Sequence, residues 1–178
     1  MRKDNLTEKL SSMRLPEIIL PKFSLNCYDN NDRVLIQISN GSVVYNDNQQ
    51  ILSNINFSVF NKNRIAIVGD NSNGKSTLVK AILNDENISK YGDWLLQKKK
   101  DIGYLDQHYS TLDHNKSVFD TVAELMPNWS LLEVRSHLND FLFRKNEEVN
   151  AFAGTLSGGE KARLSLAIIA AIHPKLLV

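Results

Sequence analysis

The stretch that decides the fold reads Gly69-Asp70-Asn71-Ser72-Asn73-Gly74-Lys75-Ser76, a loop with the spacing G-x-x-x-x-G-K-S. The apolar run Arg64–Val68 before it predicts a strand buried on both faces of a parallel sheet, and Ser76–Leu83 after it predicts a helix. Such a loop wraps a phosphate, because backbone N–H groups converge at a helix N-terminus whose dipole favours an anion. The alternative is an ordinary strand–turn–helix joint in which lysine and serine follow by chance.

Two side chains at the end of this loop indicate a nucleoside triphosphate rather than an isolated phosphate. The ammonium of Lys75 is expected to reach the β- and γ-phosphates of the nucleotide. The hydroxyl of Ser76 is expected to bind Mg²⁺, the ion that accompanies such phosphates.

A second glycine segment, Leu156-Ser157-Gly158-Gly159-Glu160, opens a helix that is predicted to run to Ile172 and to end at His173-Pro174. Ser157 and Glu160 have the spacing at which each side chain bonds the other residue's backbone N–H. The start of this helix is therefore a second end that can receive an anion. Taken alone, such a segment is more often a simple helix cap. Its occurrence in the same chain as the first loop makes it a more specific indication of a phosphate contact.

Composition bounds the class of protein. The 178 residues hold 21 Lys and Arg against 20 Asp and Glu, and a net charge of +1 does not favour a polyanion binder held by its overall field. Cys27 is the only cysteine, so no internal disulfide can form. No apolar stretch approaches the ~20 residues that span a bilayer, and residues 1–10 lack the apolar core of a secretory signal. We therefore expect a cytoplasmic protein with no transmembrane segment of its own.

The chain divides into a lead-in, residues 1–31, and a packed domain, residues 32–178. Met1–Met13 predicts a helix inside the lead-in. Within the domain, serines at 117, 130 and 157 open three segments of helical periodicity. Strands are expected at Val34–Ile38, Ser42–Tyr45, Ile55–Phe60 and Ile102–Leu105, and Lys175–Val178 is expected to begin one more buried strand.

The two glycine segments, with Gly103-Tyr104-Leu105-Asp106-Gln107-His108 between them, occur in the order seen in ATP-binding cassette (ABC) ATPases. The match covers about residues 33–178, and the motifs together with Leu15-Pro16 and Lys22-Phe23-Ser24 most resemble the second cassette of the ABC-F class. The resemblance implies an α/β fold with a P-loop NTPase core, an antiparallel β subdomain and a helical subdomain at about residues 117–156. It also implies ATP and Mg²⁺ as cofactors, and as partner a second cassette, which in the family lies on the same chain.

The resemblance further implies a role for each matching position. The first loop resembles the Walker A motif, and Gln107 resembles the Q-loop glutamine that contacts Mg²⁺ and couples the core to the helical subdomain. Leu156–Glu160 resembles the signature motif, which contacts the γ-phosphate of ATP held by the opposite cassette. Tyr45 occupies the place of the aromatic side chain that stacks on adenine, and its alternative is a half-exposed strand tyrosine. The implied ATP contacts are Tyr45, Gly69, Asp70, Asn71, Ser72, Asn73, Gly74, Lys75, Ser76, Thr77, Ser157, Gly158, Gly159 and Glu160; the implied Mg²⁺ ligands are Ser76 and Gln107.

Two departures from the family pattern bear on the chemistry. The family usually has glycine at position 72, and a positive φ there would strain Ser72 by ~1 kcal/mol. The sequence also stops before the Walker B aspartate, the catalytic glutamate and the switch histidine of the family, so we expect a domain that is incomplete at its C-terminus. Positioning and electrostatics supply nearly all of the acceleration of phosphoryl transfer. In the family the missing aspartate orders Mg²⁺ through water and the missing glutamate polarises the attacking water. We therefore expect negligible ATP hydrolysis by residues 1–178 alone. A truncated gene product, one half of a split cassette and a fragment of a longer protein all fit this pattern.

Three functions fit the resemblance. The preferred one is ATP binding by an ABC-F-like cassette, with hydrolysis only in the complete family protein, in a ribosome-associated translation or antibiotic-resistance factor. Lys98-Lys99-Lys100 is a candidate contact to ribosomal RNA, although such a triplet is more often a solvated strand end. The alternatives are the ATP-binding subunit of a membrane ABC transporter and a catalytically dead, truncated binding module.

Overall fold

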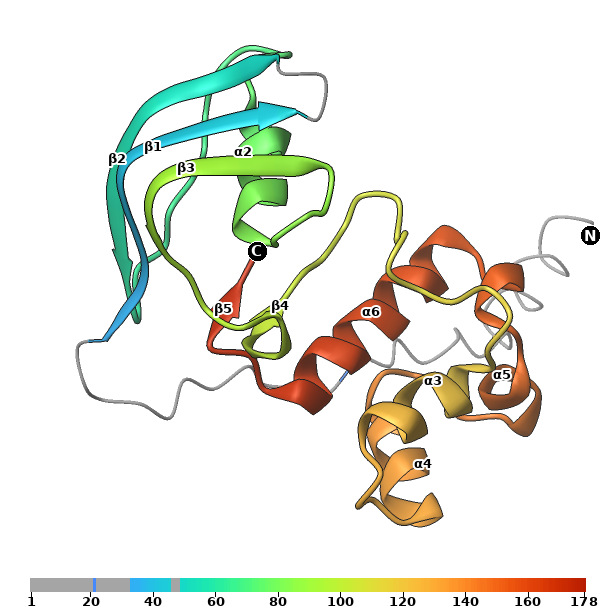
Figure 1. Cartoon of the computed structure of the whole chain (residues 1–178). Helices are drawn as coiled ribbons and strands as arrows, with labels where there is room; N and C mark the ends of the chain where they lie inside the picture. Colours follow the sequence, from blue (N-terminus) through green and yellow to red (C-terminus); the bar gives the residue numbers. More distant parts are fainter. Residues whose placement is uncertain (1–20, 22–32, 46–48) are drawn as a thin grey trace, which may run out of the picture.

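The computed structural model of the chain (Figure 1) describes residue 21, residues 33–45 and residues 49–178. The predicted helix Met1–Met13 lies outside these residues. The elements follow in the order β1 (Val34–Tyr45), β2 (Gln50–Phe60), α2 (Lys75–Ile82), β3 (Ile88–Leu95), η1 (Lys99–Asp101), β4 (Ile102–Gly103), α3 (Val118–Leu125), α4 (Leu131–Asp140), α5 (Asn146–Asn150), η2 (Ala153–Thr155), α6 (Gly158–Ile172) and β5 (Leu176–Leu177).

A three-stranded antiparallel sheet of order β2-β1-β3 forms one lobe, together with α2. The two predicted strands Val34–Ile38 and Ser42–Tyr45 are parts of the single strand β1, joined by an irregularity at Asn40, whose φ is 50°. Helix α2 packs on the sheet through a buried cluster of Val43, Ala81 and Ile88. The antiparallel β subdomain implied by the family resemblance is therefore present.

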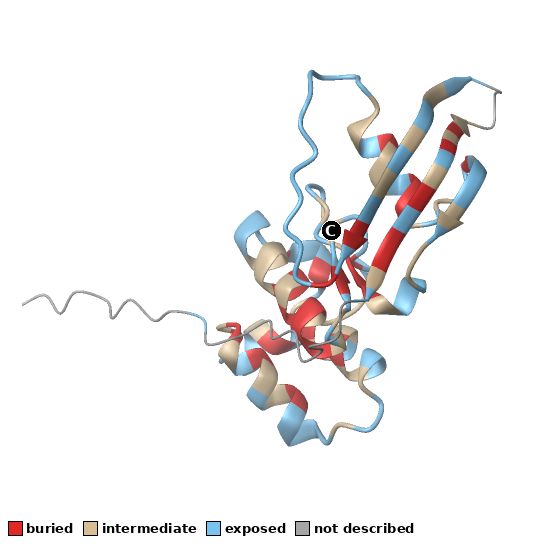
Figure 2. Cartoon of the chain, turned by 90° about the vertical axis from the view of Figure 1, so that its left-hand side faces the viewer, coloured by how far each residue is buried: buried red, intermediate tan, exposed pale blue. Residues whose placement is uncertain are grey.

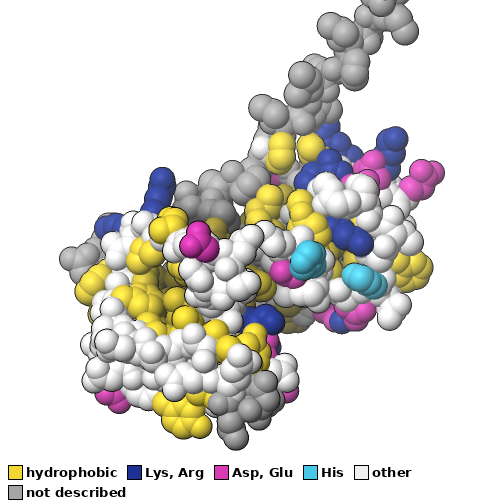
Figure 3. All heavy atoms as spheres, turned by 90° about the horizontal axis from the view of Figure 1, so that it is seen from above, with side chains coloured by type: hydrophobic (Ala, Val, Ile, Leu, Met, Phe, Trp, Pro, Cys, Tyr) yellow, Lys and Arg dark blue, Asp and Glu magenta, His cyan; other side chains and the backbone are white. Residues whose placement is uncertain are grey.

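The remaining helices α3, α4, α5 and α6 form a second lobe, called here the helical lobe (Figure 1). Its core is a single cluster that includes Val122, Leu138, Phe141 and Leu164, all almost fully buried. The serines predicted to open helices do so at α3, α4 and α6. Viewed from above, apolar side chains gather on the sheet lobe and charged ones more densely on the helical lobe (Figure 3).

The predicted strand Arg64–Val68 is wrong. These residues form no strand, and the side chains of Ile65, Ile67 and Val68 are 56%, 45% and 86% exposed. Figure 2 shows the connection from β2 to α2 as an exposed coil beside the sheet. A parallel strand forms only where neighbouring strands accept and donate its backbone hydrogen bonds, and within residues 33–45 and 49–178 no strand pairs with Arg64–Val68.

The predicted strands at Ile102–Leu105 and Lys175–Val178 form a short parallel pair, β4 with β5. The pairing continues beyond the strands, because Val178 N donates to Gly103 O at 2.8 Å and Leu105 N donates to Val178 O at 2.9 Å. Leu176 is buried as expected, whereas Leu177 is exposed. The second strand is thus covered on one face only.

Candidate functional site

The loop Gly69–Ser76 is folded around its own lysine. The ammonium of Lys75 donates hydrogen bonds to Gly69 O and Asp70 O, each at 2.7 Å. Asn73 N donates to Asp70 O at 3.4 Å, which closes a turn inside the loop. Residues 70–73 therefore form a turn ahead of α2, and the Lys75 ammonium lies against the carbonyl groups of Gly69 and Asp70.

Three positive φ values shape the loop, at Gly69 (152°), Ser72 (67°) and Gly74 (80°). The two glycines take them without a side-chain penalty, whereas Ser72 is strained as the sequence analysis expected for a positive φ at this position. At Gly74 the sheet also approaches closely, because an added Cβ would lie 2.7 Å from Leu52 Cδ2. Glycine at position 74 is therefore required twice, by conformation and by space.

The start of α2 has the properties of an anion site. Its N-cap is Gly74, no side chain of the described residues caps it, and no acidic residue lies in its first turn. The first N–H groups of such a helix have no partner inside the helix and carry the positive end of its dipole. The residues present thus fit a phosphate group, with the exposed Ser76 and the buried Thr77 in the same first turn.

Gln107 lies on the exposed turn that follows β4. The turn is held by Asp106, whose carboxylate accepts bonds from Ser110 N at 2.9 Å and from Ser110 Oγ at 2.6 Å. These hydrogen bonds, from the hydroxyl first and then the backbone, lower the pKa of Asp106. This role of Asp106 was not predicted from the sequence, although aspartate is a frequent turn residue whose carboxylate bonds nearby backbone N–H groups.

Tyr45 ends β1 and is half-buried. It packs against the cluster of Val43, Ala81 and Ile88, and its backbone N donates to Gln49 O at 3.1 Å. These contacts agree with a strand tyrosine, and adenine stacking by Tyr45 stays a prediction.

The segment Leu156–Glu160 forms a complete capping box at the start of α6. Ser157 N donates to Glu160 Oε2 at 2.8 Å, and Glu160 N donates to Ser157 Oγ at 3.4 Å. The Ser157 hydroxyl, which donates to the same carboxylate at 2.6 Å, is the main cause that lowers the pKa of Glu160, with a smaller contribution from the Arg163 guanidinium. A Cβ added at Gly158 or Gly159 would have no neighbour within 4 Å, so this end of α6 is sterically open.

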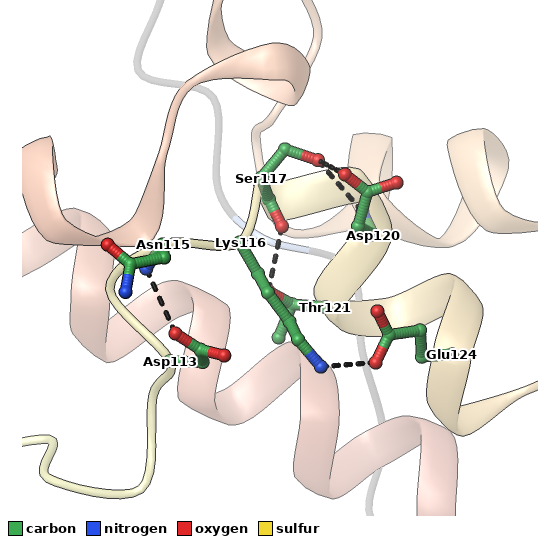
Figure 4. A network of polar contacts seen from close by, with 7 residues as sticks. All are labelled: Asp113, Asn115, Lys116, Ser117, Asp120, Thr121 and Glu124. Carbon is green, nitrogen blue, oxygen red and sulfur yellow. Dashed lines mark hydrogen bonds and ion pairs between the residues drawn. The ribbon is translucent and has the colours of Figure 1, made fainter.

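Three backbone hydrogen bonds join the connection that follows Gln107 to the segment that precedes Ser157. Ala153 N donates to Lys116 O at 2.9 Å, Val118 N donates to Ala151 O at 3.0 Å, and Gly154 N donates to His114 O at 3.1 Å. Side chains fasten the same place at the start of α3 (Figure 4): Lys116 pairs with Glu124, and Ser117 Oγ donates to Asp120 Oδ2 at 2.6 Å. The ion pair with Glu124 is the main cause that raises the pKa of Lys116.

The predicted site residues thus fall into separate groups. The structure brings Lys75 to Gly69 and Asp70, and Ser157 to Glu160. In the part of the chain that the structure describes, no hydrogen bond joins the loop of α2 to Gln107 or to the start of α6. In Figure 1, α2 lies with the sheet, whereas α6 begins at the far end of the helical lobe.

Comparison with known proteins gives a consistent result. A family model described as ABC transporter matches residues 52–178. The probable ATP-binding protein YheS of Haemophilus influenzae is 36% identical over 81% of this chain and 23% of its own length. The ATP-binding protein Uup of Buchnera aphidicola is 32% identical over 76% of this chain and 23% of its own length. Both relatives are of the ABC-F type, and the chain spans 23% of the length of each.

Solved structures show the same fold. A bacterial Atm1-family ABC exporter with ATP bound has a TM-score of 0.62 at 23% identity, over 99% of this chain and 34% of that one. The protein cbiO1 from Clostridium perfringens, part of the ABC transporter complex cbiONQ, has a TM-score of 0.61 at 23% identity, over 83% of this chain and 64% of that one. The predicted α/β P-loop fold is confirmed.

Among the described residues, no helix has the length and apolar character that crossing a membrane requires.

Proposed function

The chain belongs to the ATP-binding cassette family, and from that premise we propose that its loop Gly69–Ser76 binds ATP together with Mg²⁺. The proposal is carried by the start of α2, which no side chain in the described part of the chain caps. The Lys75 ammonium lies in the same loop, where it donates to Gly69 O and Asp70 O. Helix N–H groups and the ammonium would together neutralise the charge of the terminal phosphates.

Residues of three separate segments would complete the nucleotide site. Mg²⁺ on a nucleotide takes most of its ligands from phosphates and water and neutralises phosphate charge. The chain would contribute the Ser76 hydroxyl from α2 and the Gln107 amide oxygen from the turn after β4, both on exposed residues. Tyr45, half-buried at the end of β1, would contact the base.

The start of α6 would serve the nucleotide of a second cassette. It lies away from α2 in Figure 1, and the space around Gly158 and Gly159 leaves room for a phosphate to approach from another molecule or domain. Because Glu160 is bonded to Ser157 and lies near Arg163, its negative charge is partly offset at that end. The proposed division is a lead-in of residues 1–31 and a partial cassette of residues 32–178, with the helical subdomain at about 117–156.

We propose that the role is that of an ABC-F protein, namely a cytoplasmic factor that acts on the ribosome in translation or antibiotic resistance. The ABC-F type of the relatives YheS and Uup supports this proposal. The exposed lysines Lys98, Lys99 and Lys100 are its candidate contacts to ribosomal RNA. Co-sedimentation of the purified chain with ribosomes, lost on substitution of the three lysines by glutamine, is the expected result.

A second candidate is the ATP-binding subunit of a membrane transporter. A relative from Streptococcus agalactiae, described as a putative ABC transporter ATP-binding protein, aligns over 99% of this chain at 28% identity. Recovery of the chain with membranes and not with ribosomes would favour this candidate. Both candidates share the nucleotide site.

Thermal unfolding of the full chain with and without Mg-ATP tests nucleotide binding directly. A ligand that binds only the folded state must raise the unfolding midpoint. We expect a higher midpoint with Mg-ATP, and a much smaller rise or none for a Lys75→Ala variant. An unchanged midpoint for the parent chain at saturating Mg-ATP would contradict the proposed function.

A further inference from the structure

Helix α2 ends in a well-formed C-terminal cap. Asn84 takes a left-handed backbone conformation, with φ at 57°, immediately after the last turn. Asn84 N donates to Ala81 O at 3.2 Å, and Asp85 N donates to Lys80 O at 3.0 Å. This pair of bonds is the Schellman arrangement, which satisfies carbonyl groups that the helix itself leaves free.

A lysine from the neighbouring sheet reaches this cap. The ammonium of Lys90, on β3, donates to Ala81 O at 3.2 Å and to Asn84 Oδ1. The same ammonium lies 5.6 Å from the ring centroid of Trp94, also on β3. Lys90 is half-buried, and this burial lowers the pKa of its ammonium. Its hydrogen bonds are stronger where water is partly excluded.

The ammonium lies where the helix dipole is negative. The opposite end of α2 is the uncapped start that faces the loop Gly69–Ser76. One rigid helix of eight residues therefore connects a fixed cation at its C-terminal end to the proposed phosphate site at its N-terminal end.

Apart from Lys90, helix α2 is held on the sheet by apolar packing, in which Ala81 and Ile82 belong to two buried clusters. Three of its residues, Thr77, Ala81 and Ile82, are buried. The chain that enters it, residues 62–73, is exposed, and no strand among the described residues pairs with Arg64–Val68. Two of the three buried residues, Ala81 and Ile82, lie in the C-terminal half of α2, where Lys90 also makes its contacts.

We infer that Lys90 is a positioning residue for the phosphate loop, because it fastens the C-terminal end of α2 to β3 and thereby fixes Gly74 and Lys75 at the other end. The inference rests on the proposed binding of Mg-ATP by this loop. Lys90 touches no nucleotide in this scheme and acts through α2.

Two measurements on residues 1–178 test the inference, with Lys90→Met as the main variant. Methionine keeps an unbranched apolar stem beside Trp94 and removes the donors and the charge. Isothermal titration with Mg-ATP is expected to show about tenfold weaker binding, as for loss of a charged hydrogen bond. Amide hydrogen exchange of residues 75–83 without nucleotide is expected to be about tenfold faster.

Lys80→Met is the matched control. Lys80 is exposed, lies in the last turn of the same helix and carries the same charge, so its removal changes the charge of α2 without removing the contacts to Ala81 and Asn84. We expect parental affinity and parental exchange of residues 75–83 for this variant. Lys90→Arg retains a charged donor and is expected to recover most of the affinity.

The outcomes separate the inference from the proposed function. Parental exchange of residues 75–83 in Lys90→Met, or equal losses in Lys90→Met and Lys80→Met, would overturn the positioning role. If the parent chain binds no Mg-ATP, the proposed function fails, and the exchange experiment still decides whether Lys90 holds α2. Faster exchange in Lys90→Met with unchanged affinity would show an anchor of the helix that does not position the loop, which also overturns the inference.

Discussion

Helices α2 and α6 both begin at a glycine-containing segment, and they satisfy their first N–H groups in different ways. At α6 the side chains of Ser157 and Glu160 bond each other's backbone N–H. At α2 the N-cap is Gly74, and no side chain of the described residues takes that part. The capping box satisfies some of the first N–H groups of α6, whereas those of α2 remain for water or for an anion.

Helix α6 also buries more residues than helix α2. Six of the fifteen residues of α6 are buried, and Leu164 and Ala167 among them lie in the core of the helical lobe. The eight residues of α2 include three buried ones, and the segment Arg64–Val68 that leads into it is exposed. Binding of a nucleotide should therefore order the start of α2 far more than the start of α6.

Removal of the Lys75 ammonium should have the largest effect on nucleotide binding at α2. Lys75→Ala is expected to lower Mg-ATP affinity about a hundredfold, because the charged donor proposed to bind the terminal phosphates is lost. Isothermal titration of the full chain measures the loss. Lys80→Ala, on the exposed side of the same helix, should bind as the parent does. Full affinity in Lys75→Ala would remove the distinction between the two helix starts.

Alanine in place of the glycine before α2 and of a glycine inside α6 should change the free energy of unfolding in opposite directions. Gly74→Ala places a side chain at φ 80° and 2.7 Å from Leu52, and should lower the free energy of unfolding by ~2 kcal/mol. Gly159→Ala, inside α6 with no neighbour within 4 Å, should raise it by ~0.5 kcal/mol, because alanine favours helix more than glycine does. Urea denaturation of both variants measures the difference. Similar destabilisation at both sites would contradict it.

Loss of the serine cap at α6 should have a smaller and pH-dependent effect. Ser157→Ala is expected to lower the free energy of unfolding by ~1 kcal/mol at neutral pH. Hydrogen bonds from Ser157 depress the pKa of Glu160 in the folded state, so this stabilisation is present above the unfolded-state pKa of Glu160 and is lost as the pH falls through the folded-state pKa. Denaturation at neutral and acidic pH should show the difference between parent and variant shrinking in acid.

The capping box of α4 offers the matched control for that experiment. Ser130 and Glu133 make the same pair of bonds, and Ser130 likewise depresses the pKa of Glu133. Ser130→Ala should therefore cost a similar amount with the same pH dependence, although α4 has no proposed phosphate contact. A Ser157→Ala effect that does not weaken in acid would show that the carboxylate plays no part in the cap.

Local determinants explain which parts of the fold could be predicted. Serine caps and the His173-Pro174 stop act within a few residues, and the starts of α4 and α6 and the end of α6 follow them. A strand depends on distant partners. Arg64–Val68 has the composition of a buried strand, but no strand among the described residues pairs with it. The strand predicted there from composition alone was therefore wrong. Strand β3 was not expected, because Lys90, Gly92 and Asp93 interrupt its apolar pattern.

The same distinction applies to the candidate site. The loop Gly69–Ser76 and the capping box at Ser157 are encoded within eight residues each, and the sequence predicted both. The contact of Lys90 with the end of α2 depends on how β3 pairs with β1 and where α2 packs on that sheet. No local pattern carries that information, so the structure was needed to find it.

The smallest predicted effect concerns Ser72 and reverses the usual direction of a substitution. Ser72 has φ 67°, which costs a residue with a Cβ ~1 kcal/mol relative to glycine. Ser72→Gly should relieve this strain in the folded loop, but glycine also gains freedom in the unfolded chain, which offsets part of the benefit. We therefore expect a net gain of about 0.5 kcal/mol or less in the free energy of unfolding, and a Mg-ATP affinity equal to or up to about twofold above that of the parent. Asn73→Gly is the control, because Asn73 has no positive φ and glycine there should only destabilise. A loss of stability in Ser72→Gly as large as in Asn73→Gly would mean that the serine is not strained, and that the loop tolerates its departure from glycine without a penalty.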